Sequence, residues 1–267
     1  MFRKNTPMTK VSGLKTLMHG NPKIGKSTAY SKLEGVWFIA TERGYNFLEC
    51  EVADAFSWQD AIEIQEYLIT EKPDGCKGVV IDTINNLAEM CEKHYCSEES
   101  IEHLSEQGFG KGYSAVKKML IDYLITFEKA GLSVHMISHS KDREMKSKVK
   151  TETIVGPDLS EGLMKAITAF CDQIFFAYVD VDGHRKMRTK PTRNIIAGDR
   201  SSKLPELMDL DLSLVDKFMS GKAIAEDPVG VSAAPQGGDA PEVKDETQET
   251  KVATTGVVRR RKVEVKK

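Results

Sequence analysis

Five short apolar runs alternate along the chain with stretches in which apolar residues recur every three or four positions. Near-continuous apolar runs are typical of strands buried on both faces of a parallel sheet, and recurrence at that spacing is typical of amphipathic helices. Strands are predicted at 14–19, 35–41, 78–83, 133–139 and 171–179, and helices from Ser57 to the turn at 72–75, over 113–130 and over 159–170. This alternation predicts an α/β fold with a mostly parallel central sheet flanked by helices.

The C-terminal part of the chain departs from this pattern. Asp182-Gly183 is a hairpin turn signal, and the very basic segment 184–193 follows it, so we expect a β-hairpin at that side of the sheet. Residues 226–249 carry seven acidic residues and one lysine, and six of the last nine residues are basic. Such a segment has too few large apolar side chains to fold. We expect a flexible arm at 1–11, one α/β domain at 12–222 and a disordered, acidic-then-basic tail at 223–267.

A phosphate-binding motif follows the first predicted strand. The pattern G-x-x-x-x-G-K-S is matched by Gly20, Asn21, Pro22, Lys23, Ile24, Gly25, Lys26 and Ser27, followed by Thr28. The glycines allow backbone turns that direct N–H groups toward an anion. The lysine is suited to the β and γ phosphates, and the Ser27 hydroxyl is suited to Mg²⁺. The strand–loop–helix context predicts a nucleotide-binding site.

A second acidic position supports the same site. The strand 78–83 ends in Asp82, and an aspartate at the end of such a strand holds Mg²⁺ directly or through water in P-loop proteins. The alternative is that Asp82 caps the helix that follows. Its distance from the motif in an alternating chain favours the metal interpretation.

Two further polar side chains end predicted strands, at the edge where open α/β sheets bind ligands. Glu42 follows the strand 35–41, and His139 ends the strand 133–139. We predict that Glu42 lies where an acidic residue can take part in the chemistry, and that His139 donates to the γ-phosphate and responds to its loss. The alternatives are a solvated turn glutamate and a structural histidine.

A basic segment follows His139 directly. Residues 141–152 contain five basic and three acidic residues without apolar periodicity, which predicts a flexible loop. A basic loop beside a γ-phosphate sensor is suited to couple the nucleotide state to a DNA backbone. The candidate DNA-binding residues are Lys141, Arg143, Lys146, Lys148 and Lys150. The alternative is a solvated loop with no ligand.

Two other segments invite weaker interpretations. Cys91, His94, Cys96 and His103 do not match the spacing of the usual zinc sites, so we expect no metal there. The glycine-rich segment 108–113 contains two aromatic residues and a lysine. It is either a mobile loop that stacks on bases or a hinge before the next helix.

Composition narrows the class of protein. The chain has 267 residues, 40% of them apolar, and a net charge of −2, so any nucleic-acid site must be a local patch. No apolar run is long enough to span a membrane, and the N-terminus lacks the apolar core of a secretory signal. Five scattered cysteines favour a reduced, cytoplasmic protein.

Taken together, these motifs give the chain a family resemblance over residues 12–210. With the P-loop, Glu42, Asp82, His139 and the segments 189–193 and 198–200, it resembles the RecA-like recombinase core. It is most similar to small phage and prophage ATPases described as single-strand-annealing or recombinase-like NTP-binding proteins. The resemblance implies a RecA-like ATPase domain and, if the protein is phage-encoded, a location in the bacterial host cytoplasm.

The resemblance also implies roles for individual residues. It assigns water activation to Glu42, because Thr83 occupies the place after Asp82 where helicase relatives carry a glutamate. His139 stands where recombinases commonly have glutamine. The segment 141–155 corresponds to a loop that contacts single-stranded DNA. Lys190 and Arg193 correspond to residues that reach the ATP of a neighbouring subunit.

The predicted function is an Mg-ATP-dependent ATPase that binds single-stranded DNA and promotes annealing or strand exchange as a homo-oligomer. The tail is a candidate contact for a single-strand-binding protein or a replication partner, and we expect no membrane contact. One alternative is a replication accessory ATPase, such as a helicase or its loader. Another is a nucleotide-gated scaffold with little turnover. The resemblance implies ATP rather than GTP, and the lack of a guanine-reading N-K-x-D motif in the sequence agrees with this.

Overall fold

The computed structural model describes residue 4, residues 6–146 and residues 151–222. Lys148, Lys150 and the predicted tail at 223–267 lie outside these ranges.

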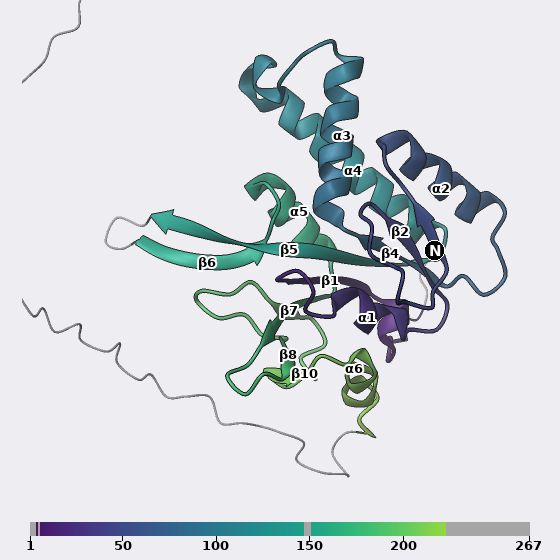
Figure 1. Cartoon of the computed structure of the whole chain (residues 1–267), viewed down its shortest axis with the longest axis vertical. Helices are drawn as coiled ribbons and strands as arrows, with labels where there is room; N and C mark the ends of the chain where they lie inside the picture. Colours follow the sequence, from purple (N-terminus) through teal and green to yellow (C-terminus); the bar gives the residue numbers. More distant parts are fainter. Residues whose placement is uncertain (1–3, 5, 147–150, 223–267) are drawn as a thin grey trace, which may run out of the picture. The chain divides into compact units, whose positions relative to one another are not determined.

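A mixed, mostly parallel sheet forms the centre of the domain (Figure 1). Its strands run in the order β10-β8-β7-β1-β5-β4-β2-β3, with β6 paired to β5 and β9 paired to β7. The pairs from β7 to β3 along this order are parallel, whereas β8, β9 and β10 are antiparallel to their neighbours. The bounds are β1 (Lys15–Gly20), β2 (Val36–Ala40), β3 (Val52–Asp54), β4 (Gly78–Asp82), β5 (Ser133–Lys146), β6 (Thr151–Pro157), β7 (Gln173–Val179), β8 (Arg185–Arg188), β9 (Gly198–Asp199) and β10 (Leu207–Asp209).

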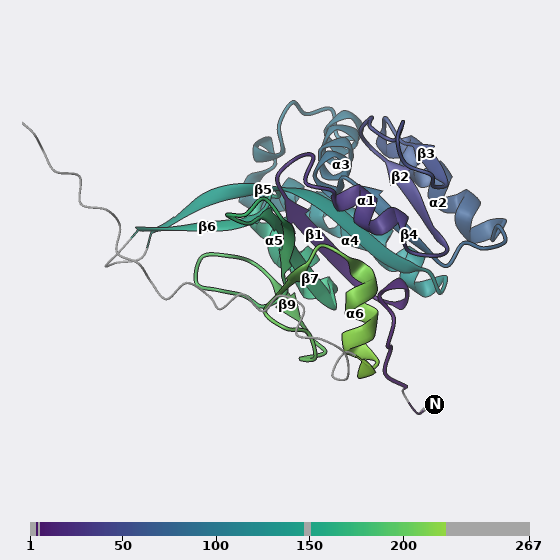
Figure 2. The same ribbon diagram turned by 60° about the horizontal axis from the view of Figure 1, so that its bottom comes forward.

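Helices cover both faces of this sheet. Apolar residues of α2, α3, α4 and α5 pack with one face, and those of α1 and α6 pack with the other (Figure 2). The helices are α1 (Lys26–Ser31), α2 (Trp58–Thr70), α3 (Ile84–Glu98), α4 (Lys111–Lys129), α5 (Glu161–Phe170) and α6 (Leu212–Met219), with short 3₁₀ turns at Val11–Gly13, Leu104–Glu106 and Gly108–Gly110. The predicted α/β fold, with its parallel sheet and its C-terminal hairpin of β7 and β8, is confirmed.

The two cores explain why the strands read as unbroken apolar runs. Successive side chains of a strand point to opposite faces, so a strand with helices on both sides needs apolar residues at every position. Phe38 and Ile39 are neighbours in β2, and both are almost fully buried. Phe38 packs in the core on the side of α1 and α6, and Ile39 packs in the core on the side of α2 to α5. Burying each such side chain stabilises the fold by about 1.5–3 kcal/mol relative to its exposure.

Local signals also set the start of α2. The Ser57 side chain accepts the backbone N–H of Asp60, and the Asp60 carboxylate accepts the backbone N–H of Ser57. This reciprocal pair satisfies two N–H groups that the first turn of a helix leaves free. The two bonds form a capping box, with aspartate in the place of the usual glutamate.

The predicted flexible loop after His139 is wrong. β5 does not end at this histidine but continues to Lys146, and it pairs antiparallel with β6 from Ser140 opposite Pro157 to Lys146 opposite Thr151. We call this two-stranded extension the β5–β6 arm (Figure 1). Backbone hydrogen bonds hold the arm together, so its sequence needs no apolar face, and the absence of periodicity was not evidence for a loop.

The glycine-rich segment 108–113 forms a 3₁₀ turn followed directly by α4, as expected for a hinge before a helix. Phe109 has a φ of 57° and a side chain that is fully exposed. Tyr113 is also exposed, within the first turn of α4. Stacking of these rings on bases stays a prediction.

Candidate nucleotide-binding site

The phosphate-loop motif connects β1 to α1 as its pattern predicts. β1 ends at Gly20, and α1 begins at Lys26 after Gly25, whose φ of 103° is strained for any residue with a Cβ. A Cβ added to Gly20 would lie 2.4 Å from the carbonyl oxygen of Ala177 in β7. Both glycines are therefore required by the backbone, the first by close packing and the second by conformation.

The ammonium of Lys26 lies inside the turn of this loop. It donates to the carbonyl oxygens of Gly20 and Asn21, both at 2.9 Å. Burial lowers the pKa of Lys26, while the negative charges of Asp82 and Glu42 act in the opposite direction. The lysine is thus a desolvated cation near two carboxylates, which is an arrangement suited to the phosphates of a nucleotide.

Ser27 and Asp82, the two predicted metal ligands, are in direct contact. The Ser27 hydroxyl donates to Oδ2 of Asp82 at 2.6 Å, and the Tyr45 hydroxyl donates to the same oxygen at 2.8 Å. Hydroxyl and carboxylate oxygens are the ligands that Mg²⁺ prefers, so these side chains fit the ion. Burial and the charge of Asp82 raise the pKa of Tyr45, which keeps its hydroxyl a donor.

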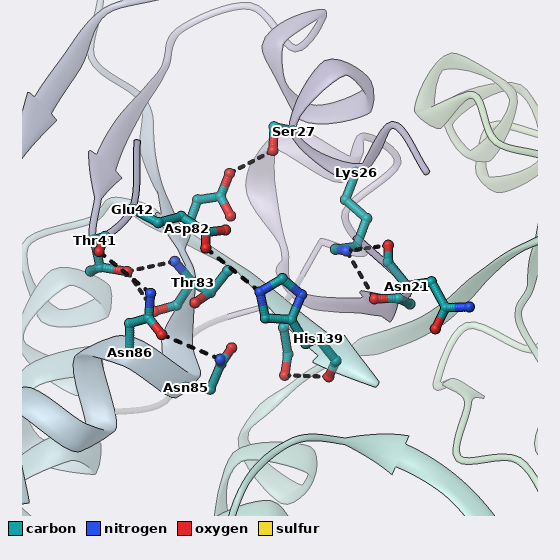
Figure 3. A network of polar contacts seen from close by, with 12 residues as sticks. Asn21, Lys26, Ser27, Thr41, Glu42, Asp82, Thr83, Asn85, Asn86 and His139 are labelled. Atoms are coloured by element: carbon teal, nitrogen blue, oxygen red, sulfur yellow. Dashed lines mark hydrogen bonds and ion pairs between the residues drawn. The ribbon is translucent and has the colours of Figure 1, made fainter. Parts of the chain in front are cut away.

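A polar lattice joins the ends of β2 and β4. The Thr41 hydroxyl accepts the backbone N–H of Thr83 at 2.7 Å and donates to the carbonyl oxygen of Thr83 at 3.1 Å. The backbone N–H of Thr41 donates to the carbonyl oxygen of Asp82 at 2.8 Å. Because Glu42 follows Thr41, this lattice fixes the position of Glu42 relative to the metal-ligand pair (Figure 3).

Glu42 and His139 meet at the same edge of the sheet. Nε2 of His139 lies 3.6 Å from Oε2 of Glu42, and both side chains retain solvent access, with exposed fractions of 28% and 38%. Among the described residues, no group bonds Nδ1 of His139, although the atom is buried. Figure 3 shows that the structure brings together four predicted residues: Lys26, Asp82, Glu42 and His139. Their catalytic roles stay predictions.

A histidine that the sequence analysis did not single out lies directly before the P-loop. Nε2 of His19 is 2.6 Å from the carbonyl oxygen of Ile196, so it carries the proton and donates, and Nδ1 accepts from the Ser140 hydroxyl at 2.8 Å. Burial lowers the pKa of His19 to about 4, which keeps the ring neutral. His19 therefore joins the start of the P-loop to the base of the β5–β6 arm.

The predicted DNA-binding residues are partly engaged within the protein. The Lys141 ammonium lies 3.3 Å from Asp158, and the Arg143 guanidinium donates to the carbonyl oxygens of Pro157, at 2.9 Å, and Leu159. Arg143 thus fastens the arm to the chain that leads into α5, an arrangement that does not favour it as a DNA contact. Lys146 ends β5.

The two residues predicted to reach a neighbouring subunit form ion pairs within the chain. The Lys190 ammonium lies 2.9 Å from Oδ2 of Asp199, whose side chain is fully buried. Nε of Arg193 donates to Oε2 of Glu152 on β6 at 2.6 Å. Either residue would have to leave its partner to contact a second nucleotide, so the role across subunits stays a prediction.

Two functional contacts lacked a usable sequence signal. Tyr45 lies three positions beyond Glu42 in an irregular segment, where no periodicity indicates the direction of a side chain. His19 reads as a polar residue at the end of a strand, and its partners are more than 100 positions away in the sequence.

Comparisons with known proteins agree with the fold. The family described as the AAA domain matches residues 12–201. A solved structure, described as the crystal structure of the RadB recombinase, has 15% sequence identity and a TM-score of 0.43, over 70% of this chain and 84% of that chain. No curated protein sequence matches the chain. The predicted RecA-like P-loop ATPase fold is confirmed. Among the described helices, none combines the length and apolar character needed to cross a membrane.

Proposed function

The chain belongs to the AAA domain family, and from this premise we propose that it binds and hydrolyses Mg-ATP in a reaction coupled to single-stranded DNA. One observation carries the nucleotide part of the proposal. The P-loop serine and the aspartate that ends β4 are 55 positions apart in the sequence, yet their side chains share a hydrogen bond of 2.6 Å. The start of α1 and the end of β4 thus bring a hydroxyl, a carboxylate and a buried ammonium to one place.

Each of these side chains has a definite task in the proposed reaction. Lys26 holds the β and γ phosphates in place of the two carbonyl oxygens that it now contacts, and Ser27 and Asp82 hold Mg²⁺. When bound, the ion neutralises charge on the phosphate oxygens. Tyr45 keeps the Asp82 carboxylate oriented.

Glu42 orients the attacking water and accepts its proton in this proposal. Glu42 directly follows Thr41, which is hydrogen-bonded to Thr83, and the Glu42 carboxylate retains solvent access. Thr83, the residue after Asp82, has no acidic group, so the base comes from another residue in this proposal, and Glu42 follows the strand next to β4. A general base is effective when it lies within hydrogen-bond reach of the water that it activates.

The β5–β6 arm supports the proposed coupling to DNA. His139 lies within β5, and the same strand continues without a break into the arm as far as Lys146. A shift of His139 on loss of the γ-phosphate would therefore move a continuous two-stranded element rather than a loose loop. We propose that the arm contacts single-stranded DNA and that the protein promotes annealing or strand exchange as a cytoplasmic homo-oligomer.

The test is steady-state ATP hydrolysis with and without single-stranded DNA, for the wild type and for Lys26→Ala. We expect DNA to stimulate hydrolysis and expect the substitution to abolish both the basal and the stimulated rates. Directional unwinding of a duplex would favour a helicase instead. Hydrolysis that DNA does not change would remove the coupling and leave a remodelling ATPase.

A further inference from the structure

An arginine on β8 lies against the P-loop from the side opposite to the predicted catalytic residues. Arg185 begins β8 and pairs with Val179, the last residue of β7, so it sits at the same sheet edge as the P-loop. A Cβ added to Gly25 would lie 3.1 Å from Nη1 of Arg185 and 3.7 Å from its Cδ. The guanidinium therefore rests beside the second glycine of the phosphate-binding loop.

The charge of Arg185 is available for a ligand, unlike the other charges on its strand. Lys186 pairs with Asp209 at 2.6 Å, and Arg188 pairs with Glu206. Within the described ranges, no carboxylate lies within 4.0 Å of the Arg185 guanidinium, and the residue is exposed. An arginine held beside an anion-binding loop without an acidic partner is suited to phosphate oxygens, which it binds through two parallel hydrogen bonds.

The sheet order indicates which end of the nucleotide Arg185 meets. β5, β4 and β2 lie on one side of β1 and carry His139, Asp82 and the lead into Glu42, where the γ-phosphate is expected. β7 and β8 lie on the other side of β1. Arg185 thus approaches the P-loop from the side away from the hydrolysis site, where the α-phosphate and the ribose belong.

We propose that Arg185 is a nucleotide-binding residue that contacts the α-phosphate and ribose end of the nucleotide bound by its own chain. This inference rests on the proposed function, because it assumes that the P-loop holds a nucleotide. Under this proposal a single chain binds the nucleotide without Lys190 and Arg193, both of which form ion pairs within the protein. Because the contact is remote from the γ-phosphate, ATP and ADP gain equally from it.

The experiment measures dissociation constants for Mg-ATP and Mg-ADP by titration calorimetry. Arg185→Ala should weaken both nucleotides by the same factor, about tenfold or more, as expected for one charge-assisted contact. Arg185→Lys should recover part of the loss, because it keeps the charge without the paired donors. Lys186→Ala is the matched control: it removes a neighbouring positive charge that is already paired, and it should leave both constants within about twofold of the wild type.

Three results would overturn the proposal. Dissociation constants of Arg185→Ala for ATP and ADP that equal those of the wild type would show that Arg185 makes no contact with the nucleotide. Weaker binding of ATP alone would place Arg185 at the γ-phosphate. An equal loss of affinity in Lys186→Ala would show that the effect comes from the overall positive charge and not from a contact of Arg185.

The variant Lys26→Ala separates failure of the Arg185 proposal from failure of the proposed function. If Lys26→Ala abolishes binding while Arg185→Ala has no effect, the nucleotide site stands without Arg185. A wild type that binds no nucleotide rejects both claims. Thermal unfolding of each variant checks that the fold is intact.

Discussion

The Glu42 carboxylate lies 3.6 Å from Nε2 of His139, although Glu42 follows β2, His139 lies within β5, and these two strands are not neighbours in the sheet. β4, which ends in Asp82, runs between β2 and β5. The proposed base and the proposed γ-phosphate sensor therefore meet above the proposed metal ligand. A substitution of Glu42 should therefore alter the surroundings of His139, and a substitution of His139 should alter those of Glu42.

We expect His139→Ala to reduce DNA stimulation of ATP hydrolysis more than it reduces basal hydrolysis. The reason is that His139 lies on the strand that continues into the arm, whereas the remaining groups of the site stay in place. His139→Gln, which keeps a hydrogen-bond donor, should restore part of the stimulation. The measurement is the ratio of stimulated to basal rates. An unchanged ratio in His139→Ala would contradict the sensor role.

Ser27→Ala should raise the Mg²⁺ concentration needed for half-maximal hydrolysis by about tenfold, which corresponds to the loss of one ligand or hydrogen bond of about 1.4 kcal/mol. The physical reason is that the Ser27 hydroxyl and Asp82 are the proposed ligands. Ser31→Ala is the matched control, because that hydroxyl bonds only the Thr28 carbonyl within α1. A Mg²⁺ titration of both variants decides the matter, and equal curves would argue against the ligand role.

Gly20→Ala should destabilise the protein by about 2–3 kcal/mol, the usual cost of overpacking a close contact. The new Cβ would lie 2.4 Å from the Ala177 carbonyl oxygen, which belongs to the backbone of β7 and cannot move away cheaply. Gly162→Ala is the control. It lies in α5, with no atom within 4 Å of the new Cβ, and it should stabilise by about 0.5–1 kcal/mol. Urea denaturation should give a free energy of unfolding below that of the wild type for Gly20→Ala and above it for Gly162→Ala. Equal free energies of unfolding would refute the packing argument.

The free energy of unfolding should fall as the pH drops from 6.5 toward 4. Burial lowers the pKa of His19 to about 4 and that of His135 to about 3, from an ordinary value of 6.5. In this window the unfolded chain binds protons that the folded chain excludes, so acid favours unfolding. The contribution of His19 is about 3 kcal/mol, present above pH 6.5 and lost by about pH 4.

The variant that checks this dependence is His19→Gln, which removes the titrating ring. Denaturant titrations between pH 4 and pH 7 should show a shallower dependence of stability on pH for His19→Gln than for the wild type. A slope in His19→Gln as steep as that of the wild type would show that His19 is not responsible.

The sequence predicted the sheet well because burial on both faces leaves an unmistakable pattern. Residues 79–81 are apolar at every position, as a parallel strand that is covered on both faces requires. The P-loop was equally predictable, since the conformation of Gly25 and the close packing of Gly20 exclude other residues. At these positions, local chemistry and tertiary structure impose the same requirement.

The sequence failed where structure depends on pairing or on distant contacts. The β5–β6 arm is held by backbone hydrogen bonds, which leave no trace in side-chain periodicity. Tyr45 reaches Asp82 from an irregular segment, and Arg185 reaches Gly25 through a hairpin that only the register of β7 and β8 defines. The hydrogen bonds of Arg143 within the protein could not be predicted for the same reason, because its partners are backbone carbonyl oxygens.

The most direct test of the proposed ATPase site is the separation of ATP binding from hydrolysis in Glu42→Gln. This change removes the carboxylate proposed to accept the proton of water and keeps the size of the side chain. Glu49→Gln is the matched control, an exposed glutamate in the same segment after β2. We expect Glu42→Gln to bind Mg-ATP as tightly as the wild type does and to hydrolyse it about 100-fold or more slowly. We expect Glu49→Gln to keep the affinity and the hydrolysis rate of the wild type. Hydrolysis by Glu42→Gln at the rate of the wild type would contradict the proposed role of Glu42.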